Sequence, residues 1–231
     1  MTGLRPLTVD AEALGLMYLD LKDFVVQAGY DHELDWQADV SLETSTEVDF
    51  MREAGWVVLS TGLREKYVRE RFRLVSRAFL DWRSATEICQ QSERCRTRAM
   101  TVFANSAKID AILEIVGIVA EVGYERVKES IRASEVDYLR RLPYVGPVTS
   151  FHLAKNLGLD VVKPDRHLVR IARATGYASP LEMCSEIATA VGDSVAVVDL
   201  VCWRFATLNR RYEREIKRLL NRRSRATATR A

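Results

Sequence analysis

The segment of residues 139–176 most constrains the fold, because helical periodicity is interrupted twice within it. Apolar residues recur every three or four positions on both sides of residues 143–147, and those five residues hold two prolines and a glycine, as tight turns do. At 163–164 a Lys-Pro pair favours extended backbone and leaves Asp165 as the N-cap of another helix. The segment is therefore predicted to form helix, hairpin, helix, short loop and helix.

The remaining chain carries mostly the spacing of buried helices and no convincing alternation typical of strands. Residues 30–46 are polar and acidic and are interpreted as a connection. Further helices are expected over residues 9–29, 47–61, 65–82, 85–89, 95–104, 106–123, 134–142 and 179–192, and in one long run from 194 past 212. We therefore expect an all-α protein.

Size and composition bound the class of protein. With 231 residues and 48% apolar content, the chain can bury a core in one large or two small domains. Its apolar runs stay below the roughly 18 residues of a membrane span, and residues 1–6 do not resemble a signal peptide. An intracellular protein, cytoplasmic or nucleoid-associated, without a membrane partner is expected. The four cysteines lack a Cys-x-x-Cys pair, so we expect them to be reduced and buried, with no metal site built from side chains.

The net charge of +2 conceals an asymmetry between the two ends. Residues 1–50 hold eleven acids and two bases, whereas residues 204–231 hold nine arginines, one lysine and two glutamates. A basic C-terminal segment suits a phosphate backbone. The alternative is a solvated helix end that frays over residues 224–229.

Two short segments resemble one family. Residues 142–149 read Leu-Pro-Tyr-Val-Gly-Pro-Val-Thr and resemble the Leu-Pro-Gly-Val-Gly-x-x-Thr hairpin of the helix-hairpin-helix (HhH-GPD) DNA glycosylases. Residues 165–170 resemble the family's Asp-x-His-Val-x-Arg segment. Tyr144 replaces the first hairpin glycine, so its backbone is expected to avoid positive φ. Val148 stands where lyase-type members carry a catalytic lysine, so the chain resembles the monofunctional branch.

The resemblance implies a fold of two helical lobes with the active site in the cleft between them. The first lobe would be a helical barrel, residues 47–158, ending in the hairpin. The second would combine residues 1–46 with 159–231. Asp165 would be the catalytic carboxylate, stabilising positive charge on the deoxyribose and accepting a proton from the attacking water.

Other roles follow from the same resemblance. His167 would orient the loop or pack, and Arg170 would pair with a carboxylate or a phosphate. Lys155 is a reserve amine whose ordinary explanation is surface solvation. A partial match of residues 59–60 to the family's Leu-Ser-Gln-Gln-Thr makes Leu63 and Arg64 candidate wedge residues, against an ordinary interhelical turn. The residues expected to contact the DNA backbone are Tyr144, Val145, Gly146, Val148, Thr149 and Lys163.

The expected activity is that of a monofunctional DNA N-glycosylase acting as a monomer on double-stranded DNA. It would flip a damaged, mismatched or enzymatically modified base and hydrolyse its N-glycosidic bond, leaving an abasic site for base excision repair. Such a reaction requires no cofactor and no iron–sulfur cluster, although the resemblance implies a monovalent cation at the hairpin carbonyls. The alternatives are a bifunctional glycosylase and AP lyase that uses Lys155, or a non-catalytic DNA-binding module.

Overall fold

The computed structural model describes residues 10–228. Within this part of the chain all regular structure is helical, with thirteen α-helices and one short 3-10 helix and no strand. The all-α prediction is confirmed. None of the helices in residues 10–228 is long and apolar enough to cross a membrane. The prediction made from residues 1–6 lies outside the described residues.

The chain divides into two compact units. The terminal unit joins the chain up to Asp39 with the chain from Asp160 onward, and the central unit is Val40–Leu159. The N-terminal part of the terminal unit ends seven residues before the predicted border at 46, because the connection after Asp39 packs on central helices. Glu43 forms an ion pair with Arg132 there, and Ser45 hydrogen-bonds the hydroxyl of Tyr124.

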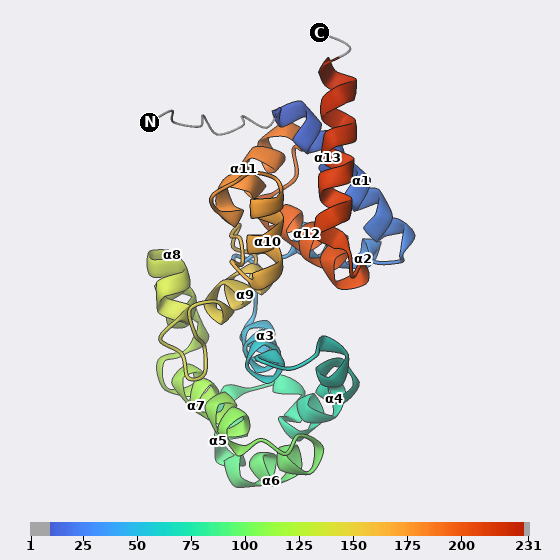
Figure 1. Ribbon diagram of the computed structural model, residues 1–231. Helices are drawn as coiled ribbons and strands as arrows, with labels where there is room; N and C mark the ends of the chain where they lie inside the picture. Colours follow the sequence, from blue (N-terminus) through green and yellow to red (C-terminus); the bar gives the residue numbers. More distant parts are fainter. Residues whose placement is uncertain (1–9, 229–231) are drawn as a thin grey trace, which may run out of the picture. The chain divides into compact units, whose positions relative to one another are not determined.

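The terminal unit is built around its first helix, α1, which packs against α11, α12 and α13 (Figure 1). Apolar side chains of all its helices share one core, in which Leu14, Met17 and Leu21 of α1 are fully buried. The helices of this unit are α1 Ala11–Gln27, α2 Asp31–Asp39, α10 Arg166–Ala174, α11 Pro180–Val191, α12 Val195–Leu208 and α13 Tyr212–Ala228.

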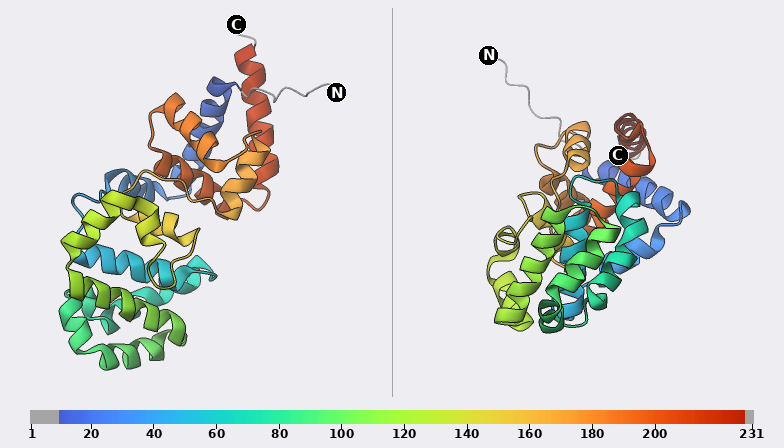
Figure 2. Two further views of the ribbon diagram at one scale, coloured as in Figure 1. Left: turned by 90° about the vertical axis from the view of Figure 1, so that its left-hand side faces the viewer. Right: turned by 90° about the horizontal axis from the view of Figure 1, so that it is seen from below.

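The central unit places α3 in contact with α4, α7 and α9 (Figure 2). Its core includes Phe50 and Val57 of α3 and Ile109 and Ile112 of α7, all at most 1% exposed. The helices of this unit are α3 Glu47–Ser60, α4 Glu65–Ala78, η1 Leu80–Trp82, α5 Ala85–Gln90, α6 Ser92–Val102, α7 Ser106–Val122, α8 Tyr124–Leu139 and α9 Thr149–Asn156.

The elements differ from the predicted ones in three places. The polar segment 30–46 contains α2, whose acids Asp31 and Glu33 suit a helix N-terminus and which buries Leu34 against its neighbours. Residues 124–134, where no helix was predicted, are helical, and α8 is interrupted by a kink at Glu135, close to the predicted helix start at 134. The predicted run past residue 212 is two helices, since residues 209–211 are not helical.

The C-terminal segment is helical as far as Ala228, so the fraying alternative is wrong for the part that the structure describes. Its last turns are held by side chains of the N-terminal region. Asp20 of α1 binds Arg222 and Arg223, and the hydroxyl of Thr227 donates to Asp10. These tertiary bonds stabilise the end of α13, and the helix propensity of residues 224–228 alone does not predict them.

Candidate functional site

The hairpin of residues 140–148 joins α8 to α9 in the central unit. Tyr144 has a φ of 63°, so the expectation that it avoids positive φ is wrong. The turn is closed by the Val145 N–H, which donates to the carbonyl of Leu142 at 3.1 Å, and the left-handed conformation of Tyr144 permits that closure. A tyrosine therefore adopts here the conformation that glycine adopts most readily, at a cost of about 1–2 kcal/mol.

Several backbone N–H and C=O groups of the hairpin form hydrogen bonds within the hairpin itself. The Gly146 N–H donates to Oγ1 of Thr149 at 2.6 Å, and the Ser150 N–H donates to the Gly146 carbonyl at 2.9 Å. The Val145 N–H is also engaged, whereas the amides of Val148 and Thr149 at the start of α9 remain for a ligand, because first-turn amides have no helical acceptor. The Val148 side chain is 39% exposed at this point.

Lys108 of α7 is a central-unit residue that the sequence did not single out. Its side chain is buried, and its Nζ donates to the carbonyls of Leu59 and Thr61 at 2.7 and 2.6 Å. The same Nζ lies 5.5 Å from the centre of the Tyr144 ring, and burial lowers the pKa of Lys108 to about 8. One lysine thus joins the end of α3 to the hairpin. The signal available in the sequence was the single lysine of the amphipathic segment 106–122.

Leu63 and Arg64 lie in the exposed turn between α3 and α4, after Gly62 with a φ of 72°. The Leu63 side chain is 43% exposed, and Arg64 is the N-cap residue of α4 without a side-chain capping bond. Such a position suits either a wedge or an ordinary turn, so their wedge role stays a prediction.

Asp165 caps α10 in the terminal unit, which confirms the predicted cap. Its Oδ1 accepts the backbone N–H groups of His167 at 2.8 Å and Leu168 at 3.1 Å. Its Oδ2 lies 3.9 Å from Nζ of Lys163, and the carboxyl side chain is only 14% exposed. Lys163, predicted to contact phosphate, therefore faces the carboxylate of Asp165 in this structure. The two oxygens of Asp165 have different environments, and only Oδ1 is occupied by the helix.

Two aspartates attach the loop before Asp165 to helix α12. Oδ2 of Asp199 in α12 accepts the Lys163 N–H at 2.6 Å, and Oδ1 of Asp160 in the loop accepts the Ala196 N–H at 2.9 Å. Asp199 is 1% exposed, whereas Asp160 is exposed. This reciprocal pair fixes the loop on both sides. The sequence did not reveal it, because the partners are 36 residues apart.

His167 and Arg170 both contact α13 or its first turn within the terminal unit. The His167 ring meets the Tyr212 ring edge-on, with Nδ1 at 3.3 Å from the tyrosine hydroxyl, and burial lowers the pKa of His167. The expected packing role of His167 fits this contact. Arg170 lies 3.7 Å from the carboxylate of Glu213, which is one of its two predicted partners.

Lys155 of α9 is only 5% exposed, so surface solvation is the wrong explanation for it. Leu153, Ala154 and Asn156 are buried as well, so the last turn of α9 is enclosed by the unit. Val148, two turns earlier, is exposed. Helical spacing alone suggested that Lys155 and Val148 lie on one face of the helix. The structure gives them different environments, since Lys155 is buried and Val148 is exposed.

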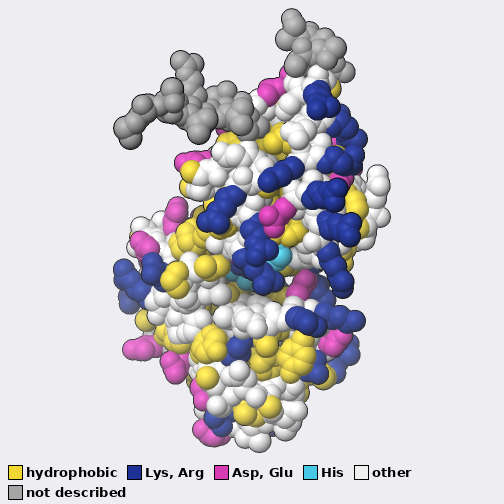
Figure 3. Space-filling model, viewed as in Figure 1, with side chains coloured by type: hydrophobic (Ala, Val, Ile, Leu, Met, Phe, Trp, Pro, Cys, Tyr) yellow, Lys and Arg dark blue, Asp and Glu magenta, His cyan; other side chains and the backbone are white. Residues whose placement is uncertain are grey.

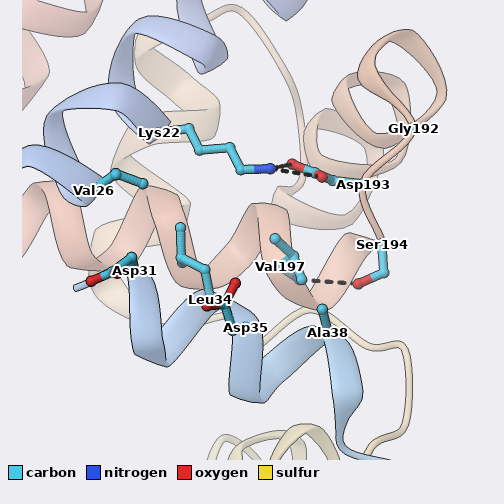
Figure 4. A pocket seen from close by; sticks show the side chains of 10 residues that line it. All are labelled: Lys22, Val26, Asp31, Leu34, Asp35, Ala38, Gly192, Asp193, Ser194 and Val197. Carbon is cyan, nitrogen blue, oxygen red and sulfur yellow. Dashed lines mark hydrogen bonds and ion pairs between the residues drawn. The ribbon is translucent and has the colours of Figure 1, made fainter.

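One cavity of the terminal unit lies elsewhere, between α1, α2 and the start of α12 (Figure 4). It has a volume of about 350 Å³, and Lys22 and Asp193 point toward each other at its wall, 2.8 Å apart. The hydroxyl of Tyr18 also donates to Asp193 at 2.5 Å. None of the predicted site residues lines this cavity.

Three of the four cysteines, Cys95, Cys184 and Cys202, are buried as expected, and Cys89 is half-buried. Within residues 10–228 no three His, Cys, Asp or Glu side chains gather where they could hold a metal ion. Comparisons with protein-family models, curated proteins and solved structures find no match to this chain. The resemblance to helix-hairpin-helix glycosylases therefore rests on the residues of the hairpin and of the Asp165 segment.

Proposed function

We propose that this protein is a monofunctional DNA N-glycosylase that hydrolyses the bond between a flipped base and its deoxyribose. The observation that carries the proposal is the placement of Asp165. Its carboxylate is largely buried at a helix N-terminus, fixed through Oδ1 by two backbone N–H groups, and follows a loop clamped on both sides by Asp160 and Asp199. Its Oδ2 takes no part in capping.

This geometry suits hydrolysis of a glycosidic bond. As the C1′–N bond breaks, the base leaves with the electron pair and positive charge develops on the sugar, which a fixed carboxylate stabilises. Water then bonds to C1′ and passes its proton to Oδ2 of Asp165. With Lys163 near the same oxygen, the carboxylate remains paired before DNA arrives. The reaction needs only water and requires no cofactor.

Val148 supports hydrolysis rather than lyase chemistry. It offers no amine at the start of α9, and Lys155 is buried. A Schiff base requires an accessible amine that attacks C1′. The start of α9 would instead bind a DNA phosphate through the amides of Val148 and Thr149. Carbonyls of the same hairpin would hold a monovalent cation, as the family resemblance implies, and Leu63 would fill the gap left by the flipped base.

A panel of duplexes carrying damaged, mismatched and modified bases tests this proposal, with hot alkali to cleave at abasic sites. At least one duplex should yield abasic sites, and Asp165→Asn should reduce the rate by at least roughly 100-fold. Asparagine is as good an N-cap as aspartate, so the variant should fold and its loss should report on chemistry. Asp193→Asn, outside the site, is the control variant.

Two outcomes would favour the alternatives. Borohydride trapping of a covalent DNA adduct would indicate a lyase, and we expect none. DNA binding without abasic sites on any duplex would indicate a non-catalytic binding module. Equal rates for Asp165→Asn and the wild type would show that the assigned carboxylate is wrong.

A further inference from the structure

The exposed side of α10 carries three arginines in a row. Arg166, Arg170 and Arg173 follow each other at steps of four and three residues and are all exposed, which places them along one side of the helix. The opposite side of α10 is buried in the core of the terminal unit through Leu168 and Ile171. This helix therefore presents cations to solvent and apolar groups to the core.

Helix α13 extends the same pattern, because it packs directly on α10. Its buried side is apolar, with Ile216 and Leu219 in the core, and its exposed residues are largely cationic. Figure 3 shows Lys and Arg side chains following both helices on one side of the unit. We call this surface the basic face, and it includes Arg166, Arg170, Arg173, Arg211, Arg214 and Lys217.

Few acids neutralise the basic face. Glu213 pairs with Arg170, and Glu215 pairs with Arg218 beside it. Among the described residues, Arg173 and Arg214 form no ion pair. Arg173 of α10 and Arg214 of α13 thus carry positive charges without an internal counter-ion among the described residues, and a ligand can neutralise each of them.

Another edge of α13 is different, because its charges are used inside the unit. Asp20 of α1 accepts Arg222 at 2.9 Å and Arg223 at 3.0 Å. Burial alone would raise the pKa of Asp20, but the two guanidinium groups lower it. One helix thus carries arginines that are paired with Asp20 and other arginines that are directed to solvent.

We propose that the basic face binds the phosphate backbone of double-stranded DNA. The choice of DNA rests on the proposed function, whereas the surface itself does not depend on any catalytic role of Asp165. A helix pair bearing repeated cations complements the closely spaced charges of a duplex. An anionic membrane fits less well, because surface helices that bind lipid expose apolar residues beside their cations, whereas Ile216, Leu219 and Leu220 are buried.

The test compares two double variants that remove the same charge from the same region. Arg173→Gln with Arg214→Gln removes two cations of the basic face, and Arg222→Gln with Arg223→Gln removes the pair bound to Asp20. Affinity for a fluorescent duplex is measured by anisotropy over a series of salt concentrations. Since each lost phosphate contact lowers the salt slope by about 0.9, the first variant should lose about 1.8 in slope and bind roughly 60-fold more weakly at about 0.1 M salt.

The second variant should keep a slope close to that of the wild type, although its melting temperature should fall because Asp20 loses its partners. Thermal melts of both variants establish that the binding change is not caused by unfolding. Equal loss of slope in the two variants, or no loss in the first, would overturn the proposal. Binding to phosphatidylserine vesicles but not to the duplex would also overturn it.

The result is separable from the glycosylase proposal. Asp165→Asn should bind the duplex as the wild type does, because Asp165 is not part of the basic face. If abasic sites form but the basic-face variant binds normally, the surface assignment fails and the activity stands. If the slope changes as expected and no base is released, the surface stands and the activity fails.

Discussion

Replacing Asp199 by alanine tests whether the loop before Asp165 is held from α12. Asp199 is 1% exposed and accepts the Lys163 N–H at 2.6 Å, so the variant removes a charge-assisted hydrogen bond and leaves that N–H without this acceptor. A hydrogen bond to a charged group contributes about 1.5–3 kcal/mol. For a chain of this size, each kcal/mol corresponds to roughly 2–4 °C in melting temperature. We therefore expect a decrease of about 3–12 °C.

Circular dichroism melts provide the assay, and Asp160→Ala is the matched control. Asp160 makes the same kind of bond in the opposite direction but is exposed, so water can replace it and the loss should be about 1 kcal/mol or less. Base release should also slow for Asp199→Ala, because the loop that Asp199 holds at Lys163 leads to Asp165 two residues later. An Asp199→Ala melt within about 1 °C of the wild type would refute the clamp.

Three further variants test other contacts. Lys108→Met removes both hydrogen bonds that Nζ donates to the carbonyls at the end of α3, so the variant should melt at a lower temperature. Burial lowers the pKa of Lys108 to about 8 in the folded protein from 10.5, so the unfolded state binds more protons between these two values. The wild type should therefore gain stability over the variant from pH 8 to 10.5, and urea melts showing a constant difference would contradict this. Gly55→Ala places a methyl carbon 2.8 Å from Trp82, so overpacking of about 1–3 kcal/mol should exceed the gain in helix propensity, and a higher melting temperature would disprove it. His167→Phe should keep the ring contact with Tyr212. Since burial lowers the pKa of His167 below 6.5, the wild type should lose stability as the pH falls below 6.5, and the variant should lose less. Thermal melts at acidic and neutral pH will measure this difference.

The sequence predicted the elements whose signals are local. Asp165 caps α10 as predicted. The helix predicted over residues 179–192 is α11, which Ser179 caps, which has Pro180 in its first turn and which ends at Gly192 in the left-handed conformation. Each depends on the bonding of one side chain or the backbone freedom of one residue within a few positions. Such signals are present in the sequence whatever the tertiary structure.

Signals that depend on distant partners could not be predicted in this way. The segment containing α2 looks like a connection because it is acidic and polar, yet it forms a helix where Leu34 finds an apolar surface and Glu33 binds Arg204. Tyr144 accepts a left-handed backbone because the turn closes around it and its ring lies against Lys108. In both cases tertiary contacts outweigh the local preference of the residue.

The same limit applies to the charge of the C-terminal segment, and it decides what that charge can do. Counting residues gives one basic tail, and a basic tail suggests phosphate binding along its whole length. In the structure the arginines of this segment differ in their partners. Asp20 binds Arg222 and Arg223, whereas Arg214 on the same helix pairs with no acid in the described chain. A guanidinium already bound to a carboxylate must break that pair before it binds phosphate, so its net gain is small. Affinity for DNA should therefore follow the number of cations without internal acids, and not the net charge of the tail.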